Sequence, residues 1–356
     1  MKTLLLALVA TLALTAPASA SLKTDVNRLV DSGVPGTIVL SRDSAHTTRL
    51  AVGVGDLKTH ARLEASDRFR VGSVTKAFTA TIVLQLAGEQ RLGLDDTVEQ
   101  HLPGVVPNGS QITIRQLLNM TSGLADYLGD DDTVANSAGT DRRFTPQELV
   151  GFATAHPVHS APGAEWRYCN TCYVLLGMIA ERVDGRPIAT QMRERIFTPA
   201  HLRHTTFESG SRIAGRHAHG YENGPADVTA LNQTWSWTAG AIVSTVDDVA
   251  RFYRALLGGK LLAPAQKREL LTPPAALQLP FGPGVMTGYT TGVFRMQLPC
   301  GEVWGHDGGT PGYRTFTLHS ADARKQVVVM TNLGEDSLTP RQASAYYRVV
   351  RTAYCG

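Results

Sequence analysis

The chain has 356 residues, of which 43% are hydrophobic and 18% are charged, so it can bury a core and intrinsic disorder is excluded. The 34 Lys and Arg residues nearly balance the 31 Asp and Glu residues, and this even charge provides no polybasic patch for nucleic acid. With 34 Gly and 18 Pro but no triplet period, a fibrous protein is excluded as well.

Residues 1–20 have the pattern of a secretory signal peptide. Lys2 precedes an apolar run at residues 4–14, and the small residues 18–20 offer a cleavage site. The alternative is an uncleaved membrane anchor, but the apolar run is well short of the roughly 20 residues that span a bilayer. We therefore expect cleavage before Ser21 and a soluble, secreted protein, either extracellular or periplasmic.

The first part of the mature chain predicts a β-hairpin followed by helices. Two β-branched runs, residues 36–42 and 49–54, are bounded by turn residues and indicate paired strands. Thr113 and Thr145 stand where helix N-caps are expected. Apolar residues at helical spacing predict helices at residues 77–86, 113–119, 145 onward, 173–183 and 245–257.

The last part changes to strands and ends in a helix at residues 343–354. The expected strands are residues 292–297, 302–304, 314–319 and 325–331. We therefore expect an α/β protein of the α+β type, with an antiparallel sheet built from both termini, flanking helices and an inserted, mainly helical region. In this interpretation residues 21–356 form one domain, with a sheet lobe at about 21–85 and 240–356 and a helical lobe at about 86–239.

Four cysteines in an exported protein favour disulfide bonds, and four allow three connectivities. Cys169 and Cys172 lie at i, i+3, a spacing that one helical turn brings within bonding range. Cys300 and Cys355 would then pair. A zinc site or a redox-active pair at Cys169 and Cys172 is the alternative, but no second pair of ligands stands at a suitable spacing.

The segment Ser73-Val74-Thr75-Lys76 carries the first candidate for catalysis. Its i, i+3 spacing places the Ser73 hydroxyl and the Lys76 amine on one face of a helix. A serine hydroxyl becomes a good nucleophile when a neighbour takes its proton, and a lysine does so when burial lowers its pKa. Alone the motif is weak, because a capping serine and a solvated lysine produce the same pattern.

Two further motifs follow in order. Tyr168 and Asn170 form a Tyr-x-Asn before an apolar helix, and a phenol beside a lysine is expected to have a lowered pKa and to relay a proton. The segment His306-Asp307-Gly308-Gly309 lies on an expected strand, where glycines let the backbone of a ligand approach closely. Their structural alternatives are a core tyrosine with a capping asparagine, and a β-bulge.

Taken together, these motifs make the chain resemble the penicillin-recognising serine hydrolases, which include class C β-lactamases, D-alanyl-D-alanine carboxypeptidases, D-aminopeptidases and esterases. The resemblance covers residues 36–355 and is strongest to the secreted carboxypeptidases of actinomycetes. Besides the motifs, the shared segments are Thr121-Ser122-Gly123-Leu124, Ala161-Pro162-Gly163, Ala239-Gly240-Ala241, Cys300-Gly301 and Cys355-Gly356.

The resemblance implies a role for each matched residue. Ser73 would be acylated, while Lys76 and Tyr168 would shuttle its proton. Asn170 would hold an amide group of the substrate. His306 stands where many relatives have Lys, and its imidazole would donate to a leaving group or a carboxylate.

The binding groups follow from the same resemblance. The backbone N–H groups of Ser73 and Gly309 would form an oxyanion hole. Gly308 and Asp307 would line the substrate cleft on the strand. Trp235 stands where relatives have an aromatic wall, although core packing is the alternative role for such a residue.

The chain departs from the relatives at two places. Both Cys169 and Cys172 replace residues that are usually small or polar, which supports a bond between them. Asp307 replaces a Thr that binds a substrate carboxylate, and its charge would repel that carboxylate by about 1 to 4 kcal/mol unless a cation such as Arg295 pairs with it. This substitution shifts weight from carboxypeptidase activity toward esters or amines.

We expect an exported serine hydrolase acting through a Ser73 acyl-enzyme, and within that class a D-alanyl-D-alanine carboxypeptidase acting on peptidoglycan peptides. An esterase or β-lactamase of the same fold is the alternative, as is a non-catalytic penicillin-binding sensor module. No cofactor and no metal are expected. The expected partner is a small peptide or ester substrate, with no nucleic acid and no integral membrane segment, and the expected state is a monomer.

Overall fold

The structure is a computed structural model that describes residues 18–129, 134, 142–273 and 279–356. The expected signal peptide lies outside the described residues except for residues 18–20, which begin helix α1 (Ala18–Asp31). Within the described ranges, no helix has the length and apolar character needed to cross a bilayer.

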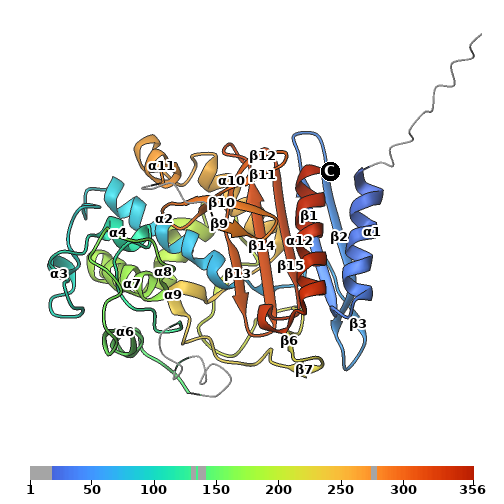
Figure 1. Ribbon diagram of the computed structural model, residues 1–356, viewed down its shortest axis with the longest axis horizontal. Coiled ribbons are helices and arrows are strands. Elements are labelled where there is room, and N and C mark those ends of the chain that lie inside the picture. Colours follow the sequence, from blue (N-terminus) through green and yellow to red (C-terminus); the bar gives the residue numbers. More distant parts are fainter. Residues whose placement is uncertain (1–17, 130–133, 135–141, 274–278) are drawn as a thin grey trace, which may run out of the picture.

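A ten-stranded antiparallel sheet forms one side of the molecule (Figure 1). Its order is β3-β2-β1-β15-β14-β12-β11-β10-β9, with β13 paired to β14. The strands are β1 (Gly36–Arg42), β2 (Thr47–Asp56), β3 (Ala61–Arg62), β9 (Leu279–Phe281), β10 (Gly284–Tyr289), β11 (Phe294–Leu298), β12 (Gly301–Gly305), β13 (Asp307–Thr310), β14 (Tyr313–His319) and β15 (Gln326–Thr331). Val39 pairs with Val329 where β1 meets β15, so the two ends of the chain join at the centre of the sheet. The predicted fold class is confirmed.

Helices cover the centre of the sheet. Helix α12 (Pro340–Cys355) packs against α1, β1 and β15, and Figure 1 shows α1 and α12 side by side. Helix α10 (Val246–Leu257) also packs against β1 and β15. All six residues of β15 are buried, as expected for a strand covered on both faces.

The other helices pack on α2 (Thr75–Gly88), which is buried along most of its length, or on α7, which packs against it. They are α3 (Val98–His101), α4 (Ile114–Leu118), α6 (Pro146–Thr154), α7 (Asn170–Asp184), α8 (Ile188–Met192), α9 (Trp237–Gly240) and α11 (Pro264–Leu271). The predicted N-caps are confirmed, since the hydroxyls of Thr113 and Thr145 accept the N–H groups of Gln116 and Glu148. These caps satisfy donors that the first helical turn leaves free.

Short strands hold the loops around the helical region. Strand β4 (Phe69–Arg70) pairs with β8 (Ile242–Ser244), which also pairs with β5 (Thr206–Phe207). Strands β6 (Tyr221–Glu222) and β7 (Ala226–Asp227) form a separate pair. The sequence did not predict β9 and β10, because their segment is rich in Gly and Pro, which are depleted in strands.

Both predicted disulfides are present. Cys169 and Cys172 are bonded with their Cα atoms 5.3 Å apart, and Cys300 and Cys355 are bonded with theirs 5.6 Å apart. The first bond lies at the start of α7, directly after Tyr168. The second ties the end of α12 to the turn between β11 and β12.

Candidate active site

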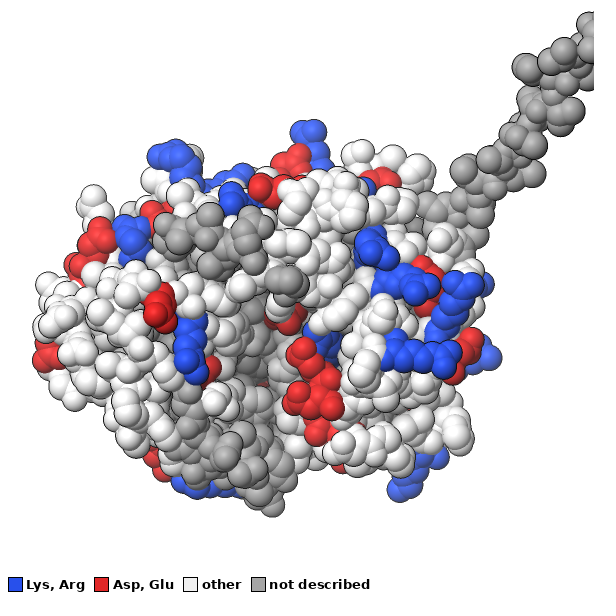
Figure 2. Space-filling view, viewed as in Figure 1, with Lys and Arg blue, Asp and Glu red and all other residues white. Residues whose placement is uncertain are grey.

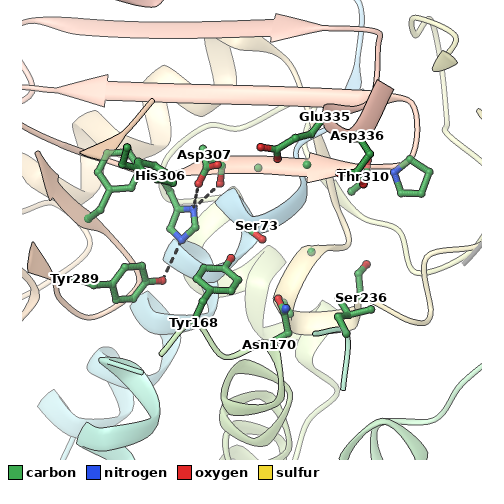
Figure 3. Close-up of a pocket in the computed structure, with 18 of the residues that line it drawn as sticks. Ser73, Tyr168, Asn170, Ser236, Tyr289, His306, Asp307, Thr310, Glu335 and Asp336 are labelled. Atoms are coloured by element: carbon green, nitrogen blue, oxygen red, sulfur yellow. Dashed lines mark hydrogen bonds and ion pairs between the residues drawn. The ribbon is translucent and has the colours of Figure 1, made fainter. Parts of the chain in front are cut away.

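A pocket of about 740 Å³ lies between the β9–β14 side of the sheet and the helical region. Figure 2 shows the face of the molecule that is hollowed, and Figure 3 shows the lining residues. Ser73, Tyr168, Asn170 and His306 line the pocket, and the buried Lys76 contacts Ser73. The fold therefore brings all three motifs to one place.

Ser73 lies in a tight 3-10 turn, Gly72–Val74, directly before α2. Strand β13 approaches this turn so closely that a Cβ atom on Gly308 would lie 2.0 Å from the carbonyl oxygen of Val71. A side chain at this position would push the strand away, so glycine is required. The contact brings the backbone of Gly309 beside the turn, where the predicted oxyanion hole needs it.

Lys76 is fully buried, and three oxygen atoms surround its Nζ atom. They are Ser73 Oγ at 2.9 Å, Asn170 Oδ1 at 2.7 Å and the carbonyl oxygen of Ala239 at 3.0 Å. Burial lowers the pKa of Lys76 from 10.5 to about 7. A neutral lysine has two N–H bonds and one lone pair. The two oxygens of Asn170 and Ala239 occupy both N–H bonds, which leaves the lone pair for the Ser73 hydroxyl.

Asp126 fixes the orientation of the Asn170 amide, a contact that the sequence did not indicate. Its buried carboxylate accepts the Nδ2 group of Asn170 at 2.9 Å and the backbone N–H of Asn170 at 3.2 Å. Burial raises the pKa of Asp126, while the charge of Lys76 opposes that shift. The carboxylate thus turns Oδ1 of Asn170 toward Lys76. Asp126 follows the shared segment Thr121–Leu124 by two residues, but nothing local indicates this contact.

Tyr168 lies beside the nucleophile, and its titration differs from the prediction. The Lys76 Nζ atom lies 4.8 Å from the centroid of its ring. We expected this cation to lower the pKa of the phenol. Instead burial and the charge of Asp307 raise the pKa of Tyr168 well above 10, and a hydrogen bond with Ser73 offsets this only in part. The phenol therefore remains protonated at neutral pH and can donate a proton.

His306 is buried and held by two neighbours. Its Nδ1–H donates to the carbonyl oxygen of Asp307, and its Nε2 accepts the hydroxyl of Tyr289 at 3.0 Å. Burial, and then the charge of Lys76, lower the pKa of His306 to about 3, so the ring is neutral. We expected this imidazole to donate to substrate, but its N–H is already bound to backbone. Both ring nitrogens of His306 therefore already have partners within the protein.

Asp307 faces the pocket with 18% of its side chain exposed. Arg295, the example given above of a cation that could pair with Asp307, instead bonds to Thr287 and lies 3.6 Å from Glu302. Arg314 is the cation near Asp307, at 4.0 Å. Burial raises the pKa of Asp307 to about 6, and Arg314 opposes the shift. At neutral pH a negative charge therefore stands where relatives have threonine.

The rest of the lining is partly apolar and partly acidic. Trp235 lies in the lining with 7% of its surface exposed. The apolar group is Trp166, Leu279, Phe281, Met286, Tyr289 and Phe294, and the acidic group is Glu222, Asp307, Glu335 and Asp336. The described lining includes no Lys and no Arg. Among residues that the structure describes, no cluster of His, Cys, Asp and Glu could hold a metal ion.

Comparison with known proteins shows the family of the chain. The family profile described as "Beta-lactamase" matches residues 22–350. The chain belongs to the β-lactamase family. Among curated members, it is 28% identical over 324 residues to "Penicillin-binding protein 4*" of Bacillus subtilis, covering 85% of this chain and 69% of that protein. The predicted resemblance is confirmed.

Two solved structures superpose closely on this chain. A D-stereospecific amidohydrolase from a Streptomyces species is 35% identical, with a TM-score of 0.83, covering 96% of this chain and 99% of the other. A D-amino acid amidase from Ochrobactrum anthropi SV3, solved with L-phenylalanine amide, is 25% identical with a TM-score of 0.84, covering 94% and 97%. This chain is a serine hydrolase of the β-lactamase and penicillin-binding protein family.

Proposed function

We propose that this protein is an amidohydrolase that cleaves amides or esters of D-amino acids through an acyl-enzyme on Ser73. Neutral Lys76 takes the proton of Ser73 as Oγ bonds to the carbonyl carbon of the substrate. Backbone N–H groups of Ser73 and Gly309 stabilise the oxyanion. Tyr168 gives a proton to the leaving amine or alcohol as its bond to carbon breaks, and is reprotonated from Lys76. Water then hydrolyses the ester and returns a proton to Ser73.

The negative charge of the pocket lining favours this reaction over the other reactions of the family. Four carboxylates line the pocket and no lysine or arginine does so in the described lining. Asp307 lines the same pocket as Tyr168, and its charge helps to raise the pKa of that phenol. A leaving group protonated by Tyr168 therefore meets a negative charge. Neutral amines and alcohols fit that position, and carboxylates are repelled.

The similar structures suggest the D configuration of the substrate, and the pocket lining suggests the type of its side chain. The Streptomyces protein is named a D-stereospecific amidohydrolase, and the Ochrobactrum protein is named a D-amino acid amidase. The apolar lining, which includes Phe281, Met286 and Phe294, suits a large apolar group on the substrate. From residues 1–20 we further propose that the protein is exported.

A D-alanyl-D-alanine carboxypeptidase, which the sequence favoured, is the second candidate. The similarity to penicillin-binding protein 4* supports it. However, its substrate ends in a carboxylate on the leaving group, which would lie near Asp307. The same argument weakens a β-lactamase, whose substrates also carry a carboxylate. We therefore rank both below the amidohydrolase.

Side-by-side turnover tests the proposal. The substrates are D-phenylalanine p-nitroanilide, its L enantiomer, a peptide ending in D-Ala-D-Ala and a chromogenic cephalosporin. We expect the D anilide to have the highest kcat/KM and the L anilide a much lower one. Ser73→Ala should abolish turnover of all four. A higher kcat/KM for the D-Ala-D-Ala peptide than for the D anilide would overturn the proposal in favour of the carboxypeptidase.

A further inference from the structure

Two oxygens hold the amine of Lys76, and they reach it from different helices. Asn170, the first residue of α7, supplies its side-chain Oδ1 at 2.7 Å. Ala239, in the short helix α9, supplies its backbone carbonyl oxygen at 3.0 Å. A helix of four residues has too few internal hydrogen bonds to fix its own conformation. The position of the Ala239 carbonyl therefore depends on the contacts that α9 makes with its neighbours.

Thr238, the residue before Ala239, connects α9 to α7. Its Oγ1 donates a hydrogen bond to the backbone carbonyl of Tyr173 at 2.9 Å. Thr238 is fully buried, and a hydrogen bond is stronger in such surroundings than in water. Tyr173 lies in the first turn of the helix that begins with Asn170. One helix thus positions both oxygens that hold Lys76, the first directly and the second through Thr238.

A second hydroxyl connects α9 to α2, the helix that carries Lys76. Thr79 is buried, and its Oγ1 donates to the backbone carbonyl of Thr238 at 2.8 Å. Thr79 follows Lys76 by three residues, so the two side chains lie on the same face of α2. Two consecutive carbonyls of α9 therefore accept two donors that lie one turn apart on α2. A displacement of Thr238 would also displace the carbonyl that Lys76 needs.

The backbone around Thr238 is shaped by this contact. Helix α7 has Gly177 where Thr238 approaches, and a Cβ atom there would lie 2.5 Å from Oγ1 of Thr238 and 2.8 Å from Cζ3 of Trp237. Trp237 has a φ of 31°, in the region that favours glycine. Such a backbone conformation persists where the surrounding contacts enforce it. The contacts with α7 and α2, and not local preference, therefore hold the start of α9 in place.

We infer that Thr238 is a positioning residue for catalysis, which holds the Ala239 carbonyl against Lys76 and so keeps the lone pair of the lysine directed at Ser73. This inference rests on the proposed role of Lys76 as the base, but not on the choice of substrate. Removing the Thr238 hydroxyl leaves every titratable side chain near Lys76 in the protein. These side chains are Asp126, Tyr168, Tyr173, His306 and Asp307.

The test removes the hydroxyl of Thr238 and keeps the shape of its side chain. Hydrolysis of a neutral p-nitrophenyl ester is measured as a function of pH for the wild type, Thr238→Val and Thr238→Ser. We expect Thr238→Val to lower kcat about 2- to 10-fold with little change in KM, the effect of one weakened hydrogen bond. The acid limb of kcat/KM should move to lower pH, because a carbonyl oxygen stabilises the protonated amine. Thr238→Ser, which retains the hydroxyl, should behave as the wild type.

Two further variants make the result specific. Thr79→Val removes the other hydroxyl that holds α9 and should reproduce both effects. Thr331→Val removes a buried hydroxyl that donates to the carbonyl of Gly36 at 2.8 Å, outside the described lining of the pocket. It should lower the melting temperature without moving the acid limb. An unchanged kcat and limb in folded Thr238→Val and Thr79→Val, or an equal shift of the limb in Thr331→Val, would overturn the inference.

A direct titration separates this inference from the proposed function. If the wild type shows no acid limb, the proposed role of Lys76 as the base fails. The Lys76 amine is then titrated by NMR in protein with isotope-labelled lysine, and Lys76→Ala identifies its signal. A lower pKa of Lys76 in Thr238→Val than in the wild type and in Thr238→Ser supports the positioning role of Thr238. The same pKa in all three proteins refutes it.

Discussion

The Nζ atom of Lys76 lies 2.9 Å from Oγ of Ser73, inside a site where the lysine has only carbonyl oxygens as its other hydrogen-bond partners in the described structure. Asn170 and Ala239 supply those two oxygens. A lysine that has lost one proton fills this site completely, with its lone pair directed at the nucleophile. The activation of Ser73 therefore depends mainly on the burial of Lys76, which lowers the pKa of this lysine, and less on the charges of neighbouring residues.

The first prediction concerns pH. Protonated Lys76 has no lone pair, so kcat/KM should rise as pH increases and level off above the pKa of Lys76, which is about 7. A neutral ester is the suitable substrate, because its own charge does not change. Lys76→Ala should lower kcat by roughly 10²- to 10⁴-fold. A pH profile without this acid limb would contradict the base role of Lys76.

Asp126 should act through Asn170 and Lys76. Its negative charge raises the pKa of Lys76, so Asp126→Asn should move the acid limb to lower pH. The weaker hydrogen bond to Asn170 should also lower kcat about tenfold. Asp248→Asn is the matched control, since Asp248 is also buried but pairs with Arg251 away from the pocket. Asp248→Asn should lower the melting temperature without moving the acid limb of the pH profile. An equal shift of the acid limb in both variants would contradict a positioning role for Asp126.

Asp307 should determine which leaving groups are accepted. Asp307→Thr should raise kcat/KM for a peptide ending in D-Ala-D-Ala by about 5- to 100-fold and barely alter that of a neutral ester. In the wild type, protonation of Asp307 below its pKa of about 6 should reduce the same discrimination. Arg295→Ala should leave it unchanged, because Arg295 bonds to Thr287 instead. Equal effects of Asp307→Thr on both substrates would mean that its charge does not face the leaving group.

The two disulfides should contribute differently to stability. Replacing Cys300 and Cys355 by Ser opens a long loop and should lower the free energy of unfolding by roughly 4 kcal/mol, against roughly 2 kcal/mol for Cys169 and Cys172. Denaturant unfolding of both double variants measures this difference. The short bond adjoins Tyr168, so its loss should lower kcat more. A larger loss of kcat when the Cys300–Cys355 bond is removed would contradict the expected effect of the Cys169–Cys172 bond on Tyr168.

Local signals in the sequence predicted local structure well. Thr113 and Thr145 cap helices because a threonine hydroxyl satisfies the free N–H groups of the turn that follows it. The sheet from both termini was predictable from β-branched runs at the two ends of the chain. Ser73, Lys76, Tyr168 and Asn170 were found because three motifs occur in a fixed order.

Contacts between distant segments were not predictable in this way. Asp126 and Arg314 reach the site only through packing, so nothing near them in the sequence indicates their partners. The direction of the Tyr168 pKa depends on burial, which a neighbouring cation alone does not reveal. Glu222 lines the pocket beside the segment after β15, because Tyr221 and Leu333, about a hundred positions apart, form a β-bridge.

The most direct test of the account is the site of acylation. A fluorophosphonate probe, which reacts with activated serine hydroxyls, is added to the folded protein, and the adduct is located by peptide mass mapping. We predict one adduct, on Ser73, which is absent from Ser73→Ala and much slower to form in Lys76→Ala. An adduct on another residue, or one that persists in Ser73→Ala, would contradict the central claim that Ser73 is the nucleophile activated by Lys76.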